Sequence, residues 1–228
     1  MRVNVAFTPA ETVRAPVAVV VDVLRATSTI AQALASGYRR VLCCAEVEEA
    51  LEVRQRLGEG VLAGERRARV IPGFELGNSP AEFVEPRGET VILTTTNGTR
   101  AIVAAAASAE TVLVGSLLNL AAAAEAASQA GSVVEVVCAG VDGRFTLDDA
   151  YCAGRLAGLL GGERSDAAEA AVRLAASFTS AEEALRAAEN PRQEDLGDDL
   201  SWCARENALA VAPRLARLEG PAAEFVAD

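Results

Sequence analysis

The stretch "VVVDVLRATSTIAQAL" (Val19–Leu34) aligns with "VILTTTNGTRAIVAAA" (Val91–Ala106) at an offset of 72 residues. In each stretch an apolar run enters a turn of small polar residues, and a helical pattern follows. A second pair, Val41–Gly60 and Val112–Gly131, continues the match at an offset of 71. Strand, turn, helix, strand and helix recur in the same order, which indicates two related βαβαβ halves. The alternative is that any two α/β stretches would align this well.

Short apolar runs alternate with longer helical patterns, which is typical of βαβ units and a mainly parallel sheet. The runs are apolar throughout, as expected for strands covered on both faces. We therefore expect a single three-layer α/β/α domain over 1–228, with the related halves at 16–65 and 88–140 and a helical C-terminal region at about 165–228. The predicted strands are Val17–Val23, Val41–Cys44, Val61–Ala63, Val91–Leu93, Val112–Val114 and Val133–Val137.

Three segments lie outside the repeat. The first residues alternate between apolar and polar, as an edge strand does, and a short strand is expected near Ala208–Ala212. Between the halves, Gly64–Phe83 is rich in glycine, proline and arginine. Ser79 and Pro80 have the pattern of an N-cap followed by proline at the first helical position. A long ordered loop of this kind inside a domain is usually functional.

Charge and the absence of histidine exclude several classes of protein. The chain has 32 acidic and 21 basic residues, all of the latter arginine, and a net charge of −11. Nucleic-acid binding is therefore disfavoured, because it needs a basic surface. Without histidine there is no Ser-His-Asp or Cys-His catalysis and no histidine-ligated zinc. Acid–base chemistry would fall to Asp, Glu, Cys, Tyr or a metal-bound water.

The sequence also indicates a compartment. No apolar run approaches the roughly 20 residues of a membrane span, and the N-terminus lacks the pattern of a signal peptide. Five cysteines without Cys-x-x-Cys spacing suggest reduced thiols. We expect a soluble cytoplasmic protein without membrane partners. For the oligomeric state, a homodimer is the expectation.

Two turns between strand and helix have the composition of an anion site. A helix N-terminus offers unpaired N–H groups and a partial positive charge. In Thr94–Thr99 the threonine hydroxyls add donors, and Gly98 allows a ligand to approach the backbone closely. "RATST" (Arg25–Thr29) forms a second such turn and adds a cation. The alternative is that these residues only cap their helices, but two equivalent turns with an arginine favour a phosphate site.

Acidic residues at the same strand ends would repel a phosphate unless a cation lay between them. Mg²⁺ binds one or two carboxylates together with waters and phosphate oxygens, and it assists phosphoryl transfer. Asp22 stands out because it ends an apolar strand, where a buried acid needs a partner. The other acids have an ordinary alternative as first-turn residues of a helix or as partners of an arginine. The candidates are Asp22, Glu65, Asp142, Asp148 and Asp149.

Cys138 to Arg144 match the Cys-x5-Arg phosphate loop of cysteine phosphatases. In that mechanism the thiolate would attack phosphorus while the loop N–H groups and the arginine held the oxygens. A match of this kind arises readily by chance in a chain with this many cysteines and arginines. Val137 and Phe145 stand where such loops usually have His and Ser or Thr, so the thiol mechanism is the minority hypothesis.

Four motifs in order resemble the 2-phosphosulfolactate phosphatase family. They are "VVVDVLRATSTI", "AGER" with "GFELGNSPAEF", "TTTNGTRAI" and "CAGVDGRFTLDDAYCAG", and they cover roughly residues 15–160. The resemblance implies an α/β fold with related halves. It also implies a Mg²⁺-dependent acid phosphatase that converts 2-phosphosulfolactate to sulfolactate, a step toward coenzyme M. Family members usually have Asp where this chain has Glu75, and the segment near residue 200 follows the family only loosely.

The resemblance and the chemistry of the residues together give a candidate site. Among the matching positions, the catalytic candidates are Asp22, Arg25, Asp149 and, in the minority mechanism, Cys138. Chemistry, not the resemblance, assigns the Mg²⁺ ligands as Asp22, Glu65 and Asp149. The substrate-binding candidates are Thr27, Arg66, Asn78, Ser79, Thr95, Thr96, Asn97, Gly98, Thr99 and Gly140.

The negative charges of this substrate are complementary to the arginines at the strand ends. Phosphosulfolactate carries a phosphate, a carboxylate and a sulfonate, and arginine binds such groups well. The available cations are Arg25, Arg66, Arg67, Arg69 and Arg144, although some of these could simply form a solvated loop. Two alternatives remain, namely a phosphatase for another small acidic phosphoester and a non-catalytic phospho-ligand binding protein.

Overall fold

The computed structural model describes residues 1–11, 15–189 and 196–227. All six apolar runs form strands in it, as predicted. The strands are β2 (Val17–Val21), β3 (Arg40–Cys44), β4 (Val61–Arg66), β6 (Thr90–Thr94), β7 (Thr111–Gly115) and β8 (Val133–Cys138). The helical patterns between them form α1 (Ala26–Ala35), α2 (Val47–Leu57), η1 (Pro80–Phe83), α3 (Gly98–Ala106), η2 (Leu117–Asn119), α4 (Leu120–Ala130) and α5 (Leu147–Leu160).

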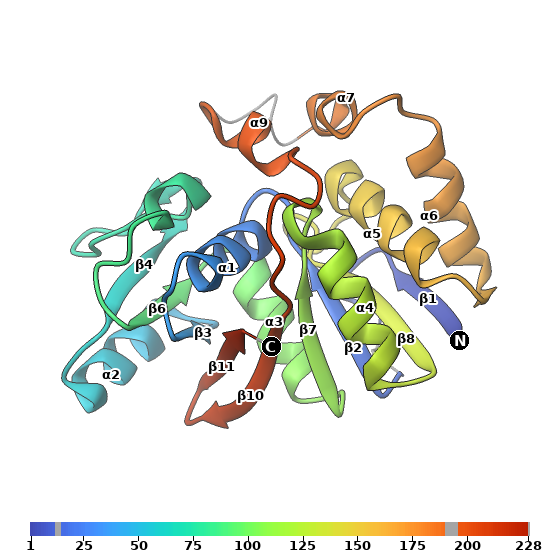
Figure 1. Cartoon of the computed structure of the whole chain (residues 1–228). Helices are drawn as coiled ribbons and strands as arrows, with labels where there is room; N and C mark the ends of the chain where they lie inside the picture. The colour runs from blue at the N-terminus through green and yellow to red at the C-terminus, as the bar shows by residue number, and fades with distance from the viewer. Residues whose placement is uncertain (12–14, 190–195, 228) are drawn as a thin grey trace.

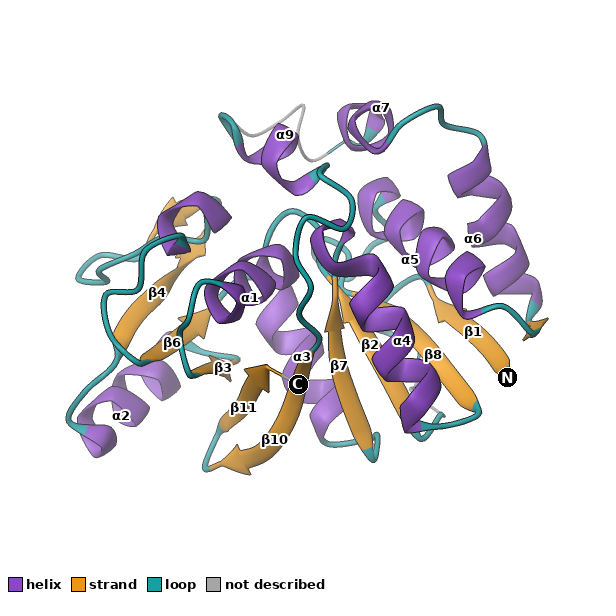
Figure 2. Ribbon diagram, viewed as in Figure 1, coloured by secondary structure: helices purple, strands orange, loops and turns teal. Residues whose placement is uncertain are grey.

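The strands form one sheet with helices on both faces, so the predicted three-layer α/β/α fold is confirmed (Figure 1, Figure 2). Strand β2 pairs in parallel with β7 and β8, and β6 pairs in parallel with β3 and β4. Because ligands bind beyond the carboxyl ends of parallel strands, this arrangement indicates where a site can form. The order of the described strands is β5-β4-β6-β3-β11-β10-β7-β2-β8-β1-β9.

The strand order is symmetric with respect to the two repeated segments. In the predicted repeat, β2, β3 and β4 correspond to β6, β7 and β8. Replacing each strand of the block β4-β6-β3 by its counterpart gives β8-β2-β7. This is the other block of the sheet, read in the opposite direction. Each block therefore contains two strands of one segment with the first strand of the other inserted between them. The strand that precedes each polar turn is thus central in its block, with a parallel neighbour on either side.

A hairpin of strands β10 (Pro213–Glu219) and β11 (Ala222–Ala227) joins the two blocks, which corrects the prediction for the C-terminal region. Helices α6 (Asp166–Ala176), α7 (Ala181–Ala187) and α9 (Asp199–Cys203) do form after residue 165, but the chain is extended beyond them. Strand β11 pairs with β3 and β10 pairs with β7, both antiparallel. Long-range pairing with these two strands decides the structure here, and local sequence does not reveal it.

The remaining strands lie at the two ends of the sheet. They are β1 (Arg2–Ala6), β5 (Arg69–Val70) and β9 (Glu163–Arg164). Strand β1 was predicted as an edge strand, but the two-residue β9 pairs outside it. The short strand expected near Ala208–Ala212 begins only at Pro213.

The core divides into clusters on the two faces of the sheet. In β2, Val19 packs with residues of α4 and α5, whereas Val20 packs with Ile30 of α1 and Ile102 of α3. All five residues of β2 are buried, as predicted for a strand covered on both faces. Packing on both faces holds β2 rigidly, and the rigid strand fixes the position of the polar turn that follows it.

All five cysteines are buried and none forms a disulfide, which agrees with the prediction of reduced thiols. No helix among the described residues has the length and apolar character to cross a membrane.

Helices α5 and α6 approach each other closely at Gly154. A Cβ at this position would lie 2.1 Å from the carbonyl oxygen of Ala171 and 2.9 Å from the Cβ of Ala175. We expect Gly154→Ala to push the helices apart and to lower the free energy of unfolding by about 2 kcal/mol, because overpacked cores cost energy of that order. Denaturant unfolding monitored by circular dichroism measures the change.

Gly158 provides the matched control, because it lies one turn further along α5 and a Cβ there would meet no atom within 4 Å. Gly158→Ala should stabilise the protein by up to about 1 kcal/mol, since alanine loses less backbone freedom in a helix. Similar losses of stability in both variants would show that the close contact at Gly154 is not the cause.

Candidate active site

A cleft of about 130 Å³ opens where β2, β4, β6 and β8 end. This volume suits a small ligand and not a nucleotide or a polymer. Polar side chains dominate its walls, in contrast to the apolar strands beneath. The residues that line it are Asp22, Leu24, Arg25, Glu65, Arg67, Ala68, Asn78, Thr96, Asn97, Val141 and Asp142.

The two polar turns have matching hydrogen bonds. Thr27 Oγ1 accepts a hydrogen bond from the backbone N–H of Asp22 and donates one to its carbonyl oxygen. Thr99 Oγ1 does the same with the backbone of Thr95, and Thr95 Oγ1 accepts from the N–H of Thr99. These three buried threonines therefore brace the turns and do not line the cleft. The capping alternative describes them better than the predicted substrate contact.

The two turns also touch each other at Gly98. A Cβ on this residue would lie 2.2 Å from Asp22 Oδ2 and 2.5 Å from the Cβ of Ala26. Gly98 therefore permits the close approach that was predicted, but its neighbour is the opposite turn. The contact fixes Asp22 between the ends of two helices.

Asp22 and Glu65 are the acids of the cleft that the chain positions most firmly. Asp22 Oδ1 accepts a hydrogen bond from the N–H of Ala26, whereas its Oδ2 accepts none from the described residues. Burial, followed by the charge of Asp148, raises the pKa of Asp22 from 3.8 to about 7. Glu65 accepts hydrogen bonds from Thr96 N–H and Ala68 N–H at 2.8 Å each. Glu65 thereby ties the end of β4 to the turn after β6.

Asp149 lies behind the cleft and not in its lining. Its two carboxylate oxygens accept hydrogen bonds from the backbone N–H groups of Val23 and Gly140, at 2.9 Å each. Burial, followed by Asp148 and Asp22, raises its pKa well above the usual value. Asp149 and Gly140 thus join the turn after β2 to the turn after β8. This arrangement favours a role for Asp149 and Gly140 in holding the turns, and their direct contacts with metal and substrate stay predictions.

Arg25 is the best-placed cation of the cleft, and its main partner lies far away in the sequence. Its NH1 group lies 2.5 Å from Oδ2 of Asp199, in α9, and the two side chains are 11% and 7% exposed. Ser79 Oγ donates a hydrogen bond to Oδ1 of the same carboxylate. Ser79 occupies the predicted N-cap position of η1, with Pro80 first in the helix, but its hydroxyl binds Asp199 and not the helix.

The arginines after β4 separate into two groups. Arg66 donates hydrogen bonds to Glu65 O, Ala45 O and Thr94 Oγ1, so it braces the strand ends and does not line the cleft. The exposed neighbouring residue, Arg67, lines the cleft instead. Of the two neighbouring arginines, Arg67 and not the predicted Arg66 therefore faces the cleft.

Asn78, Asn97 and Thr96, three of the predicted substrate-binding residues, line the cleft. Asn78 Oδ1 is buried and has no hydrogen-bond partner among the described residues. Asn97 Oδ1 accepts a hydrogen bond from the N–H of Asp142, whose carboxylate is exposed in the same cleft. A buried acceptor without a donor is unusual, and it is consistent with a bound group that supplies the missing partner.

Cys138 does not have the environment of a nucleophile. It is completely buried in the apolar cluster beneath α5, and it does not line the cleft. Burial, followed by the charge of Asp149, raises the pKa of the thiol well above its usual range. A reactive thiolate needs the opposite environment, exposed and electropositive. The structure therefore favours a structural role for Cys138, and the minority mechanism predicted from the Cys-x5-Arg spacing stays a hypothesis that a variant can test.

Replacing Cys138 by alanine tests this structural role. We expect kcat to stay within about threefold of the wild-type value and stability to fall by about 1 kcal/mol, as for the loss of a small buried group. The measurement is phosphatase kinetics combined with thermal unfolding. A loss of turnover in a variant that remains folded would support the thiol mechanism.

Sequence reasoning missed Asp199. It lies in the segment that follows the family motifs only loosely, and nothing local in "DDLSWC" indicates that it reaches the strand ends. The only hint was a pair of adjacent acids before an apolar residue, which is also the ordinary pattern of a helix start. The contact depends on tertiary structure alone.

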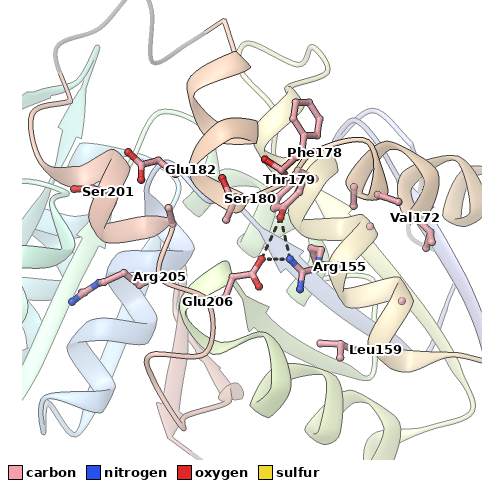
Figure 3. Close-up of a pocket in the computed structure, with 17 residues that line it drawn as sticks. Arg155, Leu159, Val172, Phe178, Thr179, Ser180, Glu182, Ser201, Arg205 and Glu206 are labelled. Atoms are coloured by element: carbon pink, nitrogen blue, oxygen red, sulfur yellow. Dashed lines mark hydrogen bonds and ion pairs between the residues drawn. The ribbon is translucent and has the colours of Figure 1, made fainter.

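A larger cavity, of about 770 Å³, lies between α5, α6, α7 and α9 (Figure 3). Figure 3 shows Arg155 and Glu206 pointing toward each other as an ion pair in its lining, and both also bind the hydroxyl of Tyr151. These charged groups satisfy one another, and the carboxylates of the strand-end cleft are absent from the lining. The smaller cleft is therefore the candidate active site.

A comparison with known families covers nearly the whole chain. A profile described as 2-phosphosulpholactate phosphatase matches residues 4–217 of the chain. The chain belongs to this family.

Relatives extend the match to most of the chain. A 2-phosphosulfolactate phosphatase of Methanothermobacter thermautotrophicus is 38% identical over 93% of this chain and 92% of its own. A probable 2-phosphosulfolactate phosphatase of Thermotoga maritima is 38% identical over 93% of this chain and 95% of its own. A further probable member from Deinococcus radiodurans is 46% identical over 62% of this chain and 60% of its own. The family resemblance stated from four motifs is therefore confirmed.

Proposed function

We propose that this member of the 2-phosphosulfolactate phosphatase family is a Mg²⁺-dependent phosphatase that hydrolyses 2-phosphosulfolactate to sulfolactate and phosphate. The observation that carries the proposal is the cleft in which Asp22, Glu65 and Arg25 meet at the strand ends. Family membership and the names of the relatives support the choice of substrate.

The charges of the cleft favour an anionic substrate held together with a cation. Arg25 and Arg67 line the cleft together with Asp22, Glu65 and Asp142. Two guanidinium groups can hold the phosphoryl group and a second acidic group of a substrate. The three carboxylates of the cleft, however, would repel both of these anionic groups. A bound divalent cation would remove this repulsion.

The donor set fits Mg²⁺. Among the described residues, no three His, Cys, Asp or Glu side chains are grouped closely enough to hold a metal ion by themselves. Mg²⁺ does not need such a group, because it keeps several waters and binds one or two protein carboxylates. Asp22 Oδ2 and Asn78 Oδ1 both lack a donor among the described residues. We propose Asp22 as a direct ligand, with Glu65 and Asn78 supporting the ion or its waters.

The metal ion and the side chains of the cleft would have different roles in the reaction. When bound, Mg²⁺ would neutralise charge on the phosphoryl oxygens and lower the pKa of a bound water. Arg25 has one nitrogen paired with Asp199, and its other donors can hold phosphoryl oxygens. Asp22, with its pKa raised to about 7, gains the most from a neighbouring cation. Asp149 holds the turns on which these groups stand.

Phosphate release by the purified protein is the direct test. We expect release from 2-phosphosulfolactate with Mg²⁺ present and little or none with a chelator. A panel of other small acidic phosphoesters distinguishes the alternative phosphatase, which would prefer one of them. Tight binding of phosphosulfolactate without release would favour the non-catalytic alternative.

The position of Glu75 weakens the non-catalytic alternative. This residue replaces the usual Asp of the family, but its carboxylate accepts a hydrogen bond from Leu62 N–H at 2.8 Å and does not line the cleft. The substitution therefore does not alter the lining directly. A cytoplasmic location, a role in coenzyme M biosynthesis and a homodimer remain predictions.

A further inference from the structure

Asp199 connects two sides of the cleft that are far apart in the sequence. Its Oδ2 lies 2.5 Å from Arg25 NH1, and its Oδ1 accepts a hydrogen bond from Ser79 Oγ. Arg25 follows β2, Ser79 precedes η1, and Asp199 begins α9. One buried carboxylate thus determines where the guanidinium stands.

The pairing uses only part of the guanidinium. The guanidinium of Arg25 has no other hydrogen-bond or ion-pair partner among the described residues, and the side chain lines the cleft although it is 11% exposed. A guanidinium carries five N–H donors in a fixed plane. Holding NH1 on Asp199 therefore fixes the plane and leaves the other nitrogens free to bind an anion.

Other contacts hold α9 in place independently of Asp199. Trp202 Nε1 donates a hydrogen bond to Gln32 Oε1 of α1, and Cys203 is completely buried. After the helix, Glu206 pairs with Arg155 of α5, as Figure 3 shows. A conservative change at Asp199 should therefore leave the helix docked, so the effect of the lost charge can be measured separately.

We propose that Asp199 is a positioning residue that orients Arg25 to bind the phosphoryl group of the substrate. The inference rests on the proposed function for its substrate, but not for the anion site itself. Asp199 does not line the cleft, so it acts through Arg25. A flexible arginine without this partner would lose rotamer entropy on binding, and the cost would weaken binding of the anion.

The experiment compares Asp199→Asn with Asp198→Asn, its exposed neighbour at the N-cap of α9, whose side chain forms neither of these contacts. Calorimetric titration with inorganic phosphate, with Mg²⁺ present, gives a readout that does not depend on turnover. We expect Asp199→Asn to weaken phosphate binding and to lower kcat/KM by about 10- to 100-fold, the range for a charge-assisted hydrogen bond. Asp198→Asn should match the wild type.

A double-mutant cycle with Arg25→Ala separates positioning from general damage. If Asp199 acts through Arg25, Asp199→Asn should weaken phosphate binding no further once Arg25 is absent. Glu206→Gln loosens the same segment at its other end and should leave phosphate affinity unchanged. Equal losses in Asp199→Asn and Glu206→Gln, or a full additional loss in the Arg25→Ala background, would overturn the inference.

Failure of the proposed function looks different. If the wild type binds phosphate but releases none from 2-phosphosulfolactate, the substrate assignment fails while the binding comparison still stands. Wild-type phosphate affinity in Asp199→Asn would overturn the inference even if the wild type is an active phosphatase.

Discussion

Asp22→Asn is expected to reduce phosphate release by about 10³-fold or more, the largest effect of any single substitution in the cleft. The amide has the shape of the carboxylate and can still accept the hydrogen bond from Ala26 N–H. It cannot supply the negative charge for which a divalent cation would bind. Steady-state kinetics with saturating Mg²⁺ measure the loss.

The same variant should be more stable than the wild type in the presence of a chelator. The pKa of Asp22 is 3.8 in the unfolded chain and about 7 in the folded protein, so the folded state binds more protons between these values. Stability contributed by this group is therefore lost as the pH rises from about 4 to 7. Asparagine does not titrate, so Asp22→Asn avoids this loss. The free energy of unfolding of the variant relative to the wild type should rise from pH 4 to pH 7 by up to about 4 kcal/mol and then stay constant. Thermal unfolding at pH 4 to 8 measures the difference.

Two controls sharpen this prediction. Asp142→Asn removes an exposed acid from the same cleft and should change the melting temperature little. Added Mg²⁺ should raise the melting temperature of the wild type by mass action and that of Asp22→Asn hardly at all. An equal response to Mg²⁺ in both proteins would place the ion elsewhere.

Gly98→Ala is expected to give the second large effect. The new methyl group would need the space of Asp22 Oδ2, 2.2 Å away, and of the Ala26 methyl, 2.5 Å away. Alanine is acceptable at the start of a helix, so space alone decides the result. The two turns must separate, and we expect a loss of about 1–3 kcal/mol in stability together with a fall of about 10²-fold in kcat/KM, because small misplacements at a catalytic centre are costly.

Arg100→Ala serves as the control for this substitution. Arg100 lies two residues along the same helix, where it forms an exposed pair with Glu46. Its removal should change neither activity nor stability by a measurable amount. Normal kinetics in Gly98→Ala would mean that the contact between the turns does not position Asp22.

Local pattern was sufficient to predict most of the fold. Strands such as β2 are apolar throughout because both faces are covered, so length and composition identified them. Pairing partners are not encoded locally, and that is why the hairpin at Pro213–Ala227 was expected to be helical. The symmetric strand order is consistent with the predicted repeat, although the duplication itself remains a prediction.

The position of residues just after the strands predicted where the cleft lies, but it did not predict which side chains point into it. Asp22 and Asn97 follow strands whose carboxyl ends meet, and both line the cleft. Thr95 and Arg66 come from the same segments, yet their polar atoms are used in bracing the turns. Residue type and spacing cannot distinguish a group that binds a ligand from one that binds the backbone. Only the observed partners do so.

The hairpin between the two blocks has a consequence for synthesis on the ribosome. Strands β10 and β11 are translated after every other described element, yet they lie between β3 and β7 near the middle of the sheet. Until they emerge, both neighbours present unpaired backbone edges, which readily join the edges of other chains. The two blocks can therefore join into one sheet only after the last described strands have been synthesised, and before then the edges of β3 and β7 are the places most open to pairing with another chain.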